Sequence, residues 1–299
     1  MNWHVNTDQA ALRETARAYL HYHLQSLADY TNVAGLLSSI SSRNYSTHRK
    51  LIKQPKIMKL IIAGSTGFVA TELIKQGLSH PAITSIVALA RRATTVPQDL
   101  GPAADATKLK SVVCDDFESY PESVKQELAG ADACIWLIAI TPSQLNTMSP
   151  EEARKVCFDY TVNGLETITK LPRDTAAKPF RFLYVSGANA ERDQTKKPWL
   201  IGDYCLMRGE VESHVLDYAK QSGGTVEAGI ARPGLIDAPG KRGFVMSVLS
   251  TIGCAVIGLP RVNNSEIAAT LLKQIVEGIE KETLLNEDLV RIGREELAK

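Results

Sequence analysis

Hydrophobic positions change their pattern along the chain near residue 57. From residue 58 onward, short apolar runs alternate with stretches of helical periodicity, as in successive β-α-β units of a parallel sheet. The apolar runs are nearly continuous, which is typical of strands covered by helices on both faces. The expected strands span residues 59–63, 85–90, 110–114, 133–140, 180–185 and 225–231.

Helical periodicity fills the intervals between these strands. Ser149 suits the N-cap of a long helix, Pro150 its first position and Glu152 the glutamate of a capping box. Residues 58–299 are therefore predicted to form an α/β fold, a doubly wound parallel sheet (Rossmann) with helices on both faces, and 237–299 a C-terminal substrate or lid region. The other expected helices span 68–77, 122–128, 204–220 and 265–281.

Residues 1–57 form an N-terminal extension of different composition. A helix is expected over 9–28, followed by a serine-rich run, and seven Lys and Arg stand against three Asp and Glu. This composition is typical of a mitochondrial transit peptide, and the string at 43–46 resembles a matrix-processing site. The alternatives are a disordered extension or a start codon chosen too far upstream, because Met58 directly precedes the first strand. We expect a cytoplasmic protein, or a mitochondrial one if residues 1–57 are a genuine transit peptide.

Composition and charge narrow the classes of partner. The chain of 299 residues is 44% hydrophobic and 22% charged with a net charge of +1, which is ordinary for a soluble globular protein. No basic excess exists to neutralise nucleic-acid phosphates. The five cysteines are scattered without a CxxC pair. This argues against a disulfide scaffold or a zinc site and for a reducing compartment, so no metal is expected.

The longest apolar stretch covers residues 244–259. Serines, a threonine and glycines interrupt it, and it is shorter than the ~20 apolar residues that a spanning helix needs. We interpret it as a buried helix or a lid over the substrate site. The alternative is a surface membrane anchor with Lys241 and Arg242 as its basic flank.

The turn after the first strand has the chemistry of a phosphate loop. Gly64 permits a tight turn, and Gly67 lets the backbone approach a pyrophosphate. The following helix presents unpaired N–H groups and a positive dipole end. No Gly-Lys-Ser or Gly-Lys-Thr occurs at the offset that a P-loop requires. The predicted dinucleotide-binding residues of this loop are Gly64, Ser65, Thr66, Gly67, Phe68 and Val69.

The end of the second strand indicates which dinucleotide is bound. NAD-specific folds place an Asp or Glu there for the ribose 2′-hydroxyl, but residues 88–90 supply no acid. Arg91 and Arg92 follow at once, and a guanidinium suits a 2′-phosphate. The sequence therefore favours NADP(H) over NAD(H), which remains a second possibility. The alternative for the arginine pair is a solvated strand end.

Three further positions are candidates for contact with the cofactor. Asp116 and Phe117 follow the third strand and are placed to meet the adenine, although Asp116 could equally cap a helix. Thr141 closes the fourth strand near the expected nicotinamide ribose, where a strand-ending turn is the alternative.

A catalytic set is predicted beyond the carboxyl end of the fifth strand. Ser186 ends that strand, while Tyr204 and Arg208 lie four apart and so share one face of the following helix. Tyr204 can pass a proton to a carbonyl oxygen as hydride arrives, Arg208 can lower the tyrosine pKa, and Ser186 can orient the oxygen. Packing and surface roles are the alternative for Tyr204 and Arg208.

Five strings give the chain a recognisable resemblance: IIAGSTGFVATELI, VALARR, FRFLYVSG, YCLMRGEVE and ARPGLIDAPG. Over about four fifths of its length it resembles extended or atypical short-chain dehydrogenases/reductases. The nearest likeness is to fungal proteins called nucleoside-diphosphate-sugar epimerases and to the Tat-interacting oxidoreductase-like branch. The resemblance implies a Ser–Tyr–Lys set at Ser186, Tyr204 and position 208, with Pro233 and Gly234 lining the nicotinamide side.

Position 208 departs from that family pattern, because arginine stands where the family has lysine. Arginine keeps the charge but differs in bulk and geometry. Three functions therefore stay open. The first is NADP(H)-dependent oxidation or reduction of a small carbonyl compound. The second is a non-catalytic NADP(H) sensor. The third is a sugar-nucleotide epimerase, which the absence of an acid after the second strand disfavours.

Overall fold

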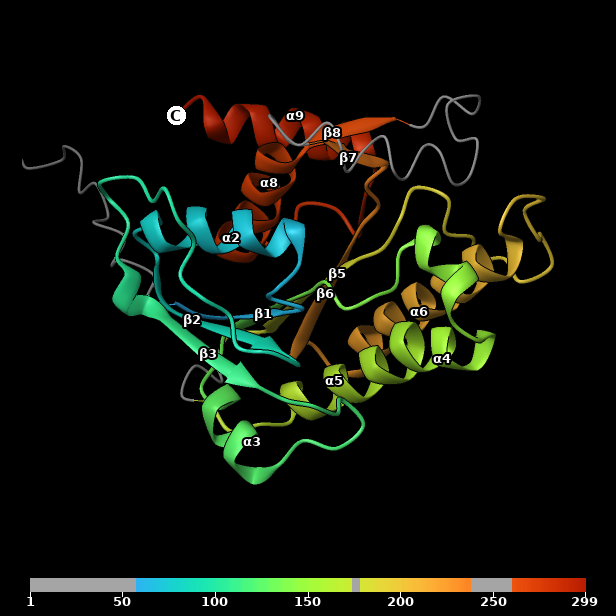
Figure 1. The fold of residues 1–299 in the computed structure, drawn as a ribbon, viewed down its shortest axis with the longest axis horizontal. Coiled ribbons are helices and arrows are strands. Elements are labelled where there is room, and N and C mark those ends of the chain that lie inside the picture. The colour runs from blue at the N-terminus through green and yellow to red at the C-terminus, as the bar shows by residue number, and fades with distance from the viewer. Residues whose placement is uncertain (1–57, 174–177, 238–259) are drawn as a thin grey trace, which may run out of the picture. The chain divides into compact units, whose positions relative to one another are not determined.

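The computed structural model describes residues 58–173, 178–237 and 260–299 (Figure 1). The extension 1–57 and the apolar stretch 244–259 lie outside these residues, and so do the predictions of a transit peptide, a lid and a membrane anchor that rest on them. Within the described ranges, no helix is long and apolar enough to cross a membrane.

Seven parallel strands form one sheet in the order β3-β2-β1-β4-β5-β6-β9. The order reverses at β1, which lies between β2 and β4. In open α/β sheets ligands bind beyond the carboxyl ends of the strands at such a switch point. The strands are β1 (Met58–Ala63), β2 (Ile83–Ala90), β3 (Leu109–Val113), β4 (Ala133–Trp136), β5 (Phe180–Val185), β6 (Val226–Ala231) and β9 (Thr283–Leu284), while β7 (Leu235–Asp237) and β8 (Arg261–Asn263) pair separately.

Helices cover both faces of the sheet (Figure 1), which confirms the predicted doubly wound fold. Alternate side chains of β1 point to opposite faces: Leu60 and Ile62 enter one core, and Ile61 and Ala63 the other. The first core is closed by α2 (Phe68–Ser79), α8 (Asn264–Glu277) and α9 (Asn286–Leu297), and the second by α3 (Glu122–Leu128), α5 (Tyr160–Thr169) and α6 (Gly202–Gln221). The remaining elements are η1 (Ala106–Lys108), η2 (Pro142–Thr147), α4 (Pro150–Arg154) and η3 (Lys155–Asp159).

The helix predicted to open at Ser149 has the expected cap. The Ser149 hydroxyl accepts from the Glu152 N–H at 3.2 Å, and the Glu152 carboxylate accepts from the Ser149 N–H at 2.9 Å. The helix then runs from α4 through a π turn, η3, into α5. Such π turns occur frequently at functional sites.

Two predicted boundaries are wrong. The fourth strand ends at Trp136 rather than residue 140, because Ile138 lies against Gly64 of the phosphate loop and Ile140 packs with α4 and η3 instead of entering the sheet. The helix predicted over 265–281 is α8, which stops at Glu277. Gly278 has a φ of 127°, a conformation that suits glycine and ends the helix, and the additional helix α9 follows.

Candidate functional site

The phosphate loop joins the carboxyl end of β1 to α2. Gly64 has a φ of 85°, which favours glycine, and the N–H groups of Gly64 and Ser65 donate to the Leu89 carbonyl at 2.9 and 3.2 Å. Gly67 donates back to Gly64 at 3.0 Å. Helix α2 has no side-chain cap and no acidic residue in its first turn. Its positive dipole end therefore faces the loop without a competing carboxylate.

The side chains of this loop differ in exposure. Thr66 is exposed, and Phe68 and Val69 are half-buried. Ser65 is only 1% exposed, and its hydroxyl shares a 2.6 Å hydrogen bond with the hydroxyl of Thr94. The loop thus offers a backbone cradle at its surface, and Ser65 fastens it to the segment after β2.

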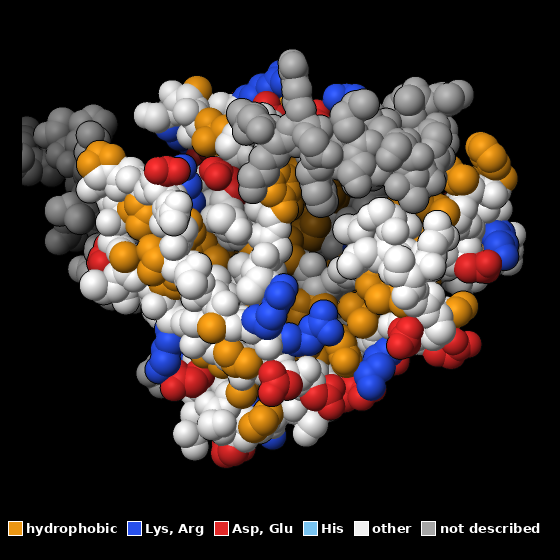
Figure 2. All heavy atoms as spheres, viewed as in Figure 1, with side chains coloured by type: hydrophobic (Ala, Val, Ile, Leu, Met, Phe, Trp, Pro, Cys, Tyr) orange, Lys and Arg blue, Asp and Glu red, His pale blue; other side chains and the backbone are white. Residues whose placement is uncertain are grey.

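Arg91 and Arg92 directly follow β2 and are both exposed. Neither forms a salt bridge or hydrogen bond with another residue of the described ranges. Figure 2 shows a hollow between the α2 side and the α4–α6 side of this face, floored by hydrophobic side chains with basic side chains at its edge. Two cations beside the phosphate loop are suited to a phosphorylated ribose.

The predicted adenine and ribose contacts are placed as follows. Asp116 is exposed, and its carboxylate accepts from the Glu118 N–H at 2.9 Å. The Phe117 ring belongs to the core, edge-on to Trp136, and the Asn163 amide donates to the Phe117 carbonyl at 2.6 Å. Thr141 caps η2 in a capping box. Asp116 and Thr141 are thus both engaged in local turns.

The structure places Ser186, Tyr204 and Arg208 around the end of β5. The Tyr204 hydroxyl donates to the Ile140 carbonyl at 2.9 Å, and Arg208 donates from Nη2 to the Val185 carbonyl at 2.7 Å. No hydrogen bond joins Ser186 to Tyr204 in the described ranges. Arg208 therefore ties α6 to the backbone just before Ser186.

Several polar atoms at this place are buried without a partner among the described residues, namely Ser186 Oγ and Arg208 Nε and Nη1. Arg208 is 3% exposed, and its guanidinium lies over the Tyr184 ring, 4.9 Å from the ring centre. Buried polar groups are normally hydrogen-bonded. Unpaired donors and acceptors here fit a ligand with hydroxyl or carbonyl oxygens, such as a ribose or a carbonyl substrate.

Burial and charge act in opposite directions on Tyr204. Burial raises the pKa of the phenol, and the neighbouring positive charge of Arg208 lowers it. Burial prevails, so the pKa of Tyr204 is raised overall. Arg208 acts in the predicted direction, but it does not bring the tyrosine below its usual range.

The predicted nicotinamide-side residues lie where the loops after β5 and β6 meet. Pro233 accepts from the Ala188 N–H at 2.8 Å, and the Gly234 N–H donates to the Asn286 side chain at 2.9 Å. Asn286 begins α9, an element that the sequence analysis did not predict. The C-terminal segment therefore supports this side of the site.

Glu212 links the same two loops and was missed from the sequence. Its carboxylate is 0% exposed and accepts from Arg192 at 2.7 Å and from Nε of Arg232 at 2.9 Å. It lies one helical turn after Arg208, so the spacing Tyr204, Arg208, Glu212 on one face was the signal that could have identified it.

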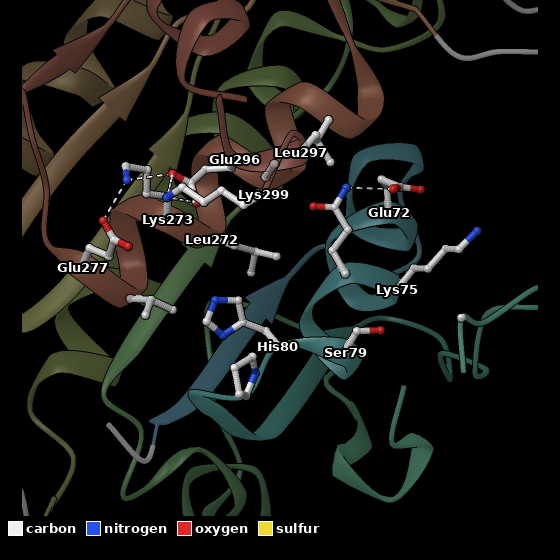
Figure 3. Close-up of a pocket in the computed structure, with 15 residues that line it drawn as sticks. Glu72, Lys75, Ser79, His80, Leu272, Lys273, Glu277, Glu296, Leu297 and Lys299 are labelled. Atoms are coloured by element: carbon white, nitrogen blue, oxygen red, sulfur yellow. Dashed lines mark hydrogen bonds and ion pairs between the residues drawn. The ribbon is translucent and has the colours of Figure 1, made fainter. Parts of the chain in front are cut away.

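A separate groove of about 640 Å³ lies between α2, α8 and α9 (Figure 3). His80 and Leu272 line it, and Lys273 pairs there with Glu277 and Glu296 at 2.7 and 2.8 Å. The groove lies at the far end of α2 from the phosphate loop, and twelve helical residues span about 18 Å. It contains none of the residues predicted to bind cofactor.

No family model matches the chain. A search of curated proteins gives a relative from Candida albicans named "Protein FMP52, mitochondrial". It is 26% identical over 250 residues, which cover 81% of this chain and 97% of the relative.

Solved structures show the same architecture. Vestitone reductase from alfalfa is 17% identical over 76% of each chain, with a TM-score of 0.55. A dTDP-glucose 4,6-dehydratase from Streptomyces venezuelae with NAD bound is 16% identical over 81% of each chain, with a TM-score of 0.55. A UDP-glucuronic acid 4-epimerase from Bacillus cereus in complex with NAD is 14% identical over 76% of this chain and 77% of its own, with a TM-score of 0.53.

The described part of the chain therefore has the same α/β Rossmann fold as these solved structures. The resemblance that the sequence motifs indicated is confirmed at the level of the fold.

Proposed function

We propose that the protein is an NADP(H)-dependent oxidoreductase that reduces or oxidises a small carbonyl compound, with Tyr204 as its acid/base. The observation that carries this proposal is the phosphate loop Gly64–Val69 beside Arg91 and Arg92, which have no ionic or hydrogen-bond partner among the described residues. Two of the solved relatives are described as bound to NAD, which supports a dinucleotide at this loop. The preference for the phosphorylated form rests on the two arginines.

The residues of the chain fit the roles that carbonyl reduction requires. When bound, the reduced nicotinamide supplies a hydride for the carbonyl carbon. Ser186 Oγ, which is buried and has no hydrogen-bond partner in the described part of the chain, orients the carbonyl oxygen. Tyr204 donates its proton to that oxygen as negative charge develops there. The permanent charge of Arg208 then stabilises the phenolate that remains.

The test measures NADPH consumption by the full chain over a panel of aldehydes and ketones. Replacing Tyr204→Phe removes the proton donor, so we expect kcat to fall by roughly a hundredfold or more. Tyr218→Phe is the matched control, because Tyr218 lies on the same helix and shares a 2.8 Å hydrogen bond with Thr169 away from the site. Unchanged turnover in Tyr204→Phe would contradict the assignment, as would the absence of turnover across the panel.

A second candidate is a non-catalytic NADP(H) sensor. The observation that favours it is that position 208 carries arginine rather than lysine. The Arg208 side chain is buried, and its guanidinium donates to the Val185 carbonyl. Tight NADPH binding without turnover, together with a partner protein captured in one redox state, would support this function.

A third candidate is a sugar-nucleotide epimerase, the activity in the name of the similar structure from Bacillus cereus. This chemistry uses tightly retained NAD, and no acid follows β2 to bind its ribose. Release of NAD from the purified protein on denaturation would favour it.

For localisation, the Candida albicans relative supports a mitochondrial rather than cytoplasmic protein. We propose that residues 1–57 act as a transit peptide. Diffuse cytoplasmic fluorescence of a C-terminal fusion of the full chain would contradict this.

A further inference from the structure

Residues 91–93 include both arginines, and the two residues before this segment are hydrogen-bonded to the phosphate loop and to the end of β3. The Leu89 carbonyl accepts from Gly64 and Ser65, and the Ala90 carbonyl accepts from the Cys114 N–H at 2.9 Å. The backbone entering Arg91 is therefore fixed by both the phosphate loop and the strand end of β3.

Thr94 fastens the same segment from the following side. Its hydroxyl shares the 2.6 Å hydrogen bond with Ser65, and its N–H donates to the Ser111 hydroxyl of β3 at 2.8 Å. Because Ser65 is 1% exposed, water has little access to compete for the first of these bonds.

Only three residues, all exposed, lie between these two anchors. A long arginine side chain loses conformational freedom when it binds a phosphate, and a fixed backbone reduces what must still be ordered. The contacts of Thr94 with Ser65 and Ser111 thus hold the backbone of both arginines next to the phosphate loop. This limits the positions that the two guanidinium groups can reach.

We propose that Thr94 is a positioning residue that determines cofactor specificity by holding Arg91 and Arg92 toward the 2′-phosphate. The inference rests on the proposed preference for NADP(H). Thr94 acts through the arginines, so its loss weakens the phosphorylated dinucleotide and leaves the unphosphorylated one unaffected.

The experiment titrates NADPH and NADH calorimetrically into the full chain and into five variants. Thr94→Val keeps the shape but removes the hydroxyl, and we expect it to raise the Kd for NADPH by about tenfold while that for NADH stays within about twofold. Ser111→Ala, at an exposed position of β3, removes the other anchor without touching Ser65 and should act in the same direction. Thr94→Ser restores the hydroxyl and should keep the wild-type preference.

Thr84→Val is the matched control, because the Thr84 hydroxyl bonds the Met58 carbonyl at the opposite end of β2 and should leave both affinities unchanged. Equal weakening of NADPH and NADH in Thr94→Val would overturn the inference, since Thr94 would then merely support the loop. If Arg91→Ala abolishes the preference for NADPH while Thr94→Val and Ser111→Ala retain it, the role of Thr94 is overturned and the proposed cofactor stands. A wild-type chain without preference for NADPH would overturn both it and the proposed cofactor.

Discussion

Among single residues, Tyr204 matters most to the proposed reaction, because its protonation state decides whether it can donate a proton. Burial raises the pKa of Tyr204, although Arg208 opposes the rise, so the phenol keeps its proton beyond the usual tyrosine pKa of about 10. Tyr204 is therefore protonated at neutral pH, which is the form that can donate to a carbonyl oxygen. The resting site thus holds the proton that carbonyl reduction consumes, whereas alcohol oxidation requires that this proton first be removed.

The pH dependence of the two directions follows from this shift. Reduction needs protonated Tyr204, so its rate should not fall through tyrosine ionisation up to about pH 10. Oxidation needs the phenolate, so its rate should rise with pH over the same range. Steady-state rates in both directions between neutral pH and pH 10 check this. A fall in reduction near neutral pH that disappears in Tyr204→Phe would contradict it.

The sequence predicted which residues could form this set, but not their contacts. Spacing alone placed Tyr204 and Arg208 on one face of a helix. It could not show that Arg208 binds the Val185 carbonyl, because a backbone acceptor is supplied by tertiary packing and leaves no residue-type signal. Thr94 was missed for a similar reason: a lone threonine in a loop carries no pattern.

At the scale of elements, helix α6 organises the site through three side chains on one face. Tyr204 and Arg208 face the end of β5, and Glu212 fastens the helix to the loops after β5 and β6 through Arg192 and Arg232. A buried carboxylate between two arginines leaves uncompensated charge when it is removed. Glu212 should therefore matter far more for stability than other acidic residues of the helix.

Replacing Glu212→Gln should lower the free energy of unfolding by about 3 kcal/mol, since it breaks a buried ion pair. The control is Glu210→Gln on the same helix, whose pair with Arg154 is partly exposed and should contribute less than about 1 kcal/mol. Urea denaturation of the full chain measures both. Equal losses of unfolding free energy in the two variants would contradict the prediction, because the buried ion pairs of Glu212 would then stabilise the protein no more than the partly exposed pair of Glu210.

At the scale of the whole molecule, the parallel, doubly wound sheet could be predicted from the sequence because six apolar runs and their intervening helices repeat the β-α-β pattern. The C-terminal elements were not. Strand β9 has two residues and β7 and β8 have three each, too few to show a period, and helix α9 was not predicted. These elements nevertheless support the site, because Asn286 of α9 holds Gly234.

The central claim concerns a phosphorylated dinucleotide at the phosphate loop. Calorimetric titration of the full chain with NADPH and NADH, repeated on Arg91→Ala, tests it most directly. We predict that NADPH binds at least about tenfold more tightly than NADH and that Arg91→Ala removes most of this difference, because a charge-assisted bond to the 2′-phosphate is lost. Equal affinities in the wild-type chain would contradict the cofactor assignment, and failure to bind either dinucleotide would contradict the site itself.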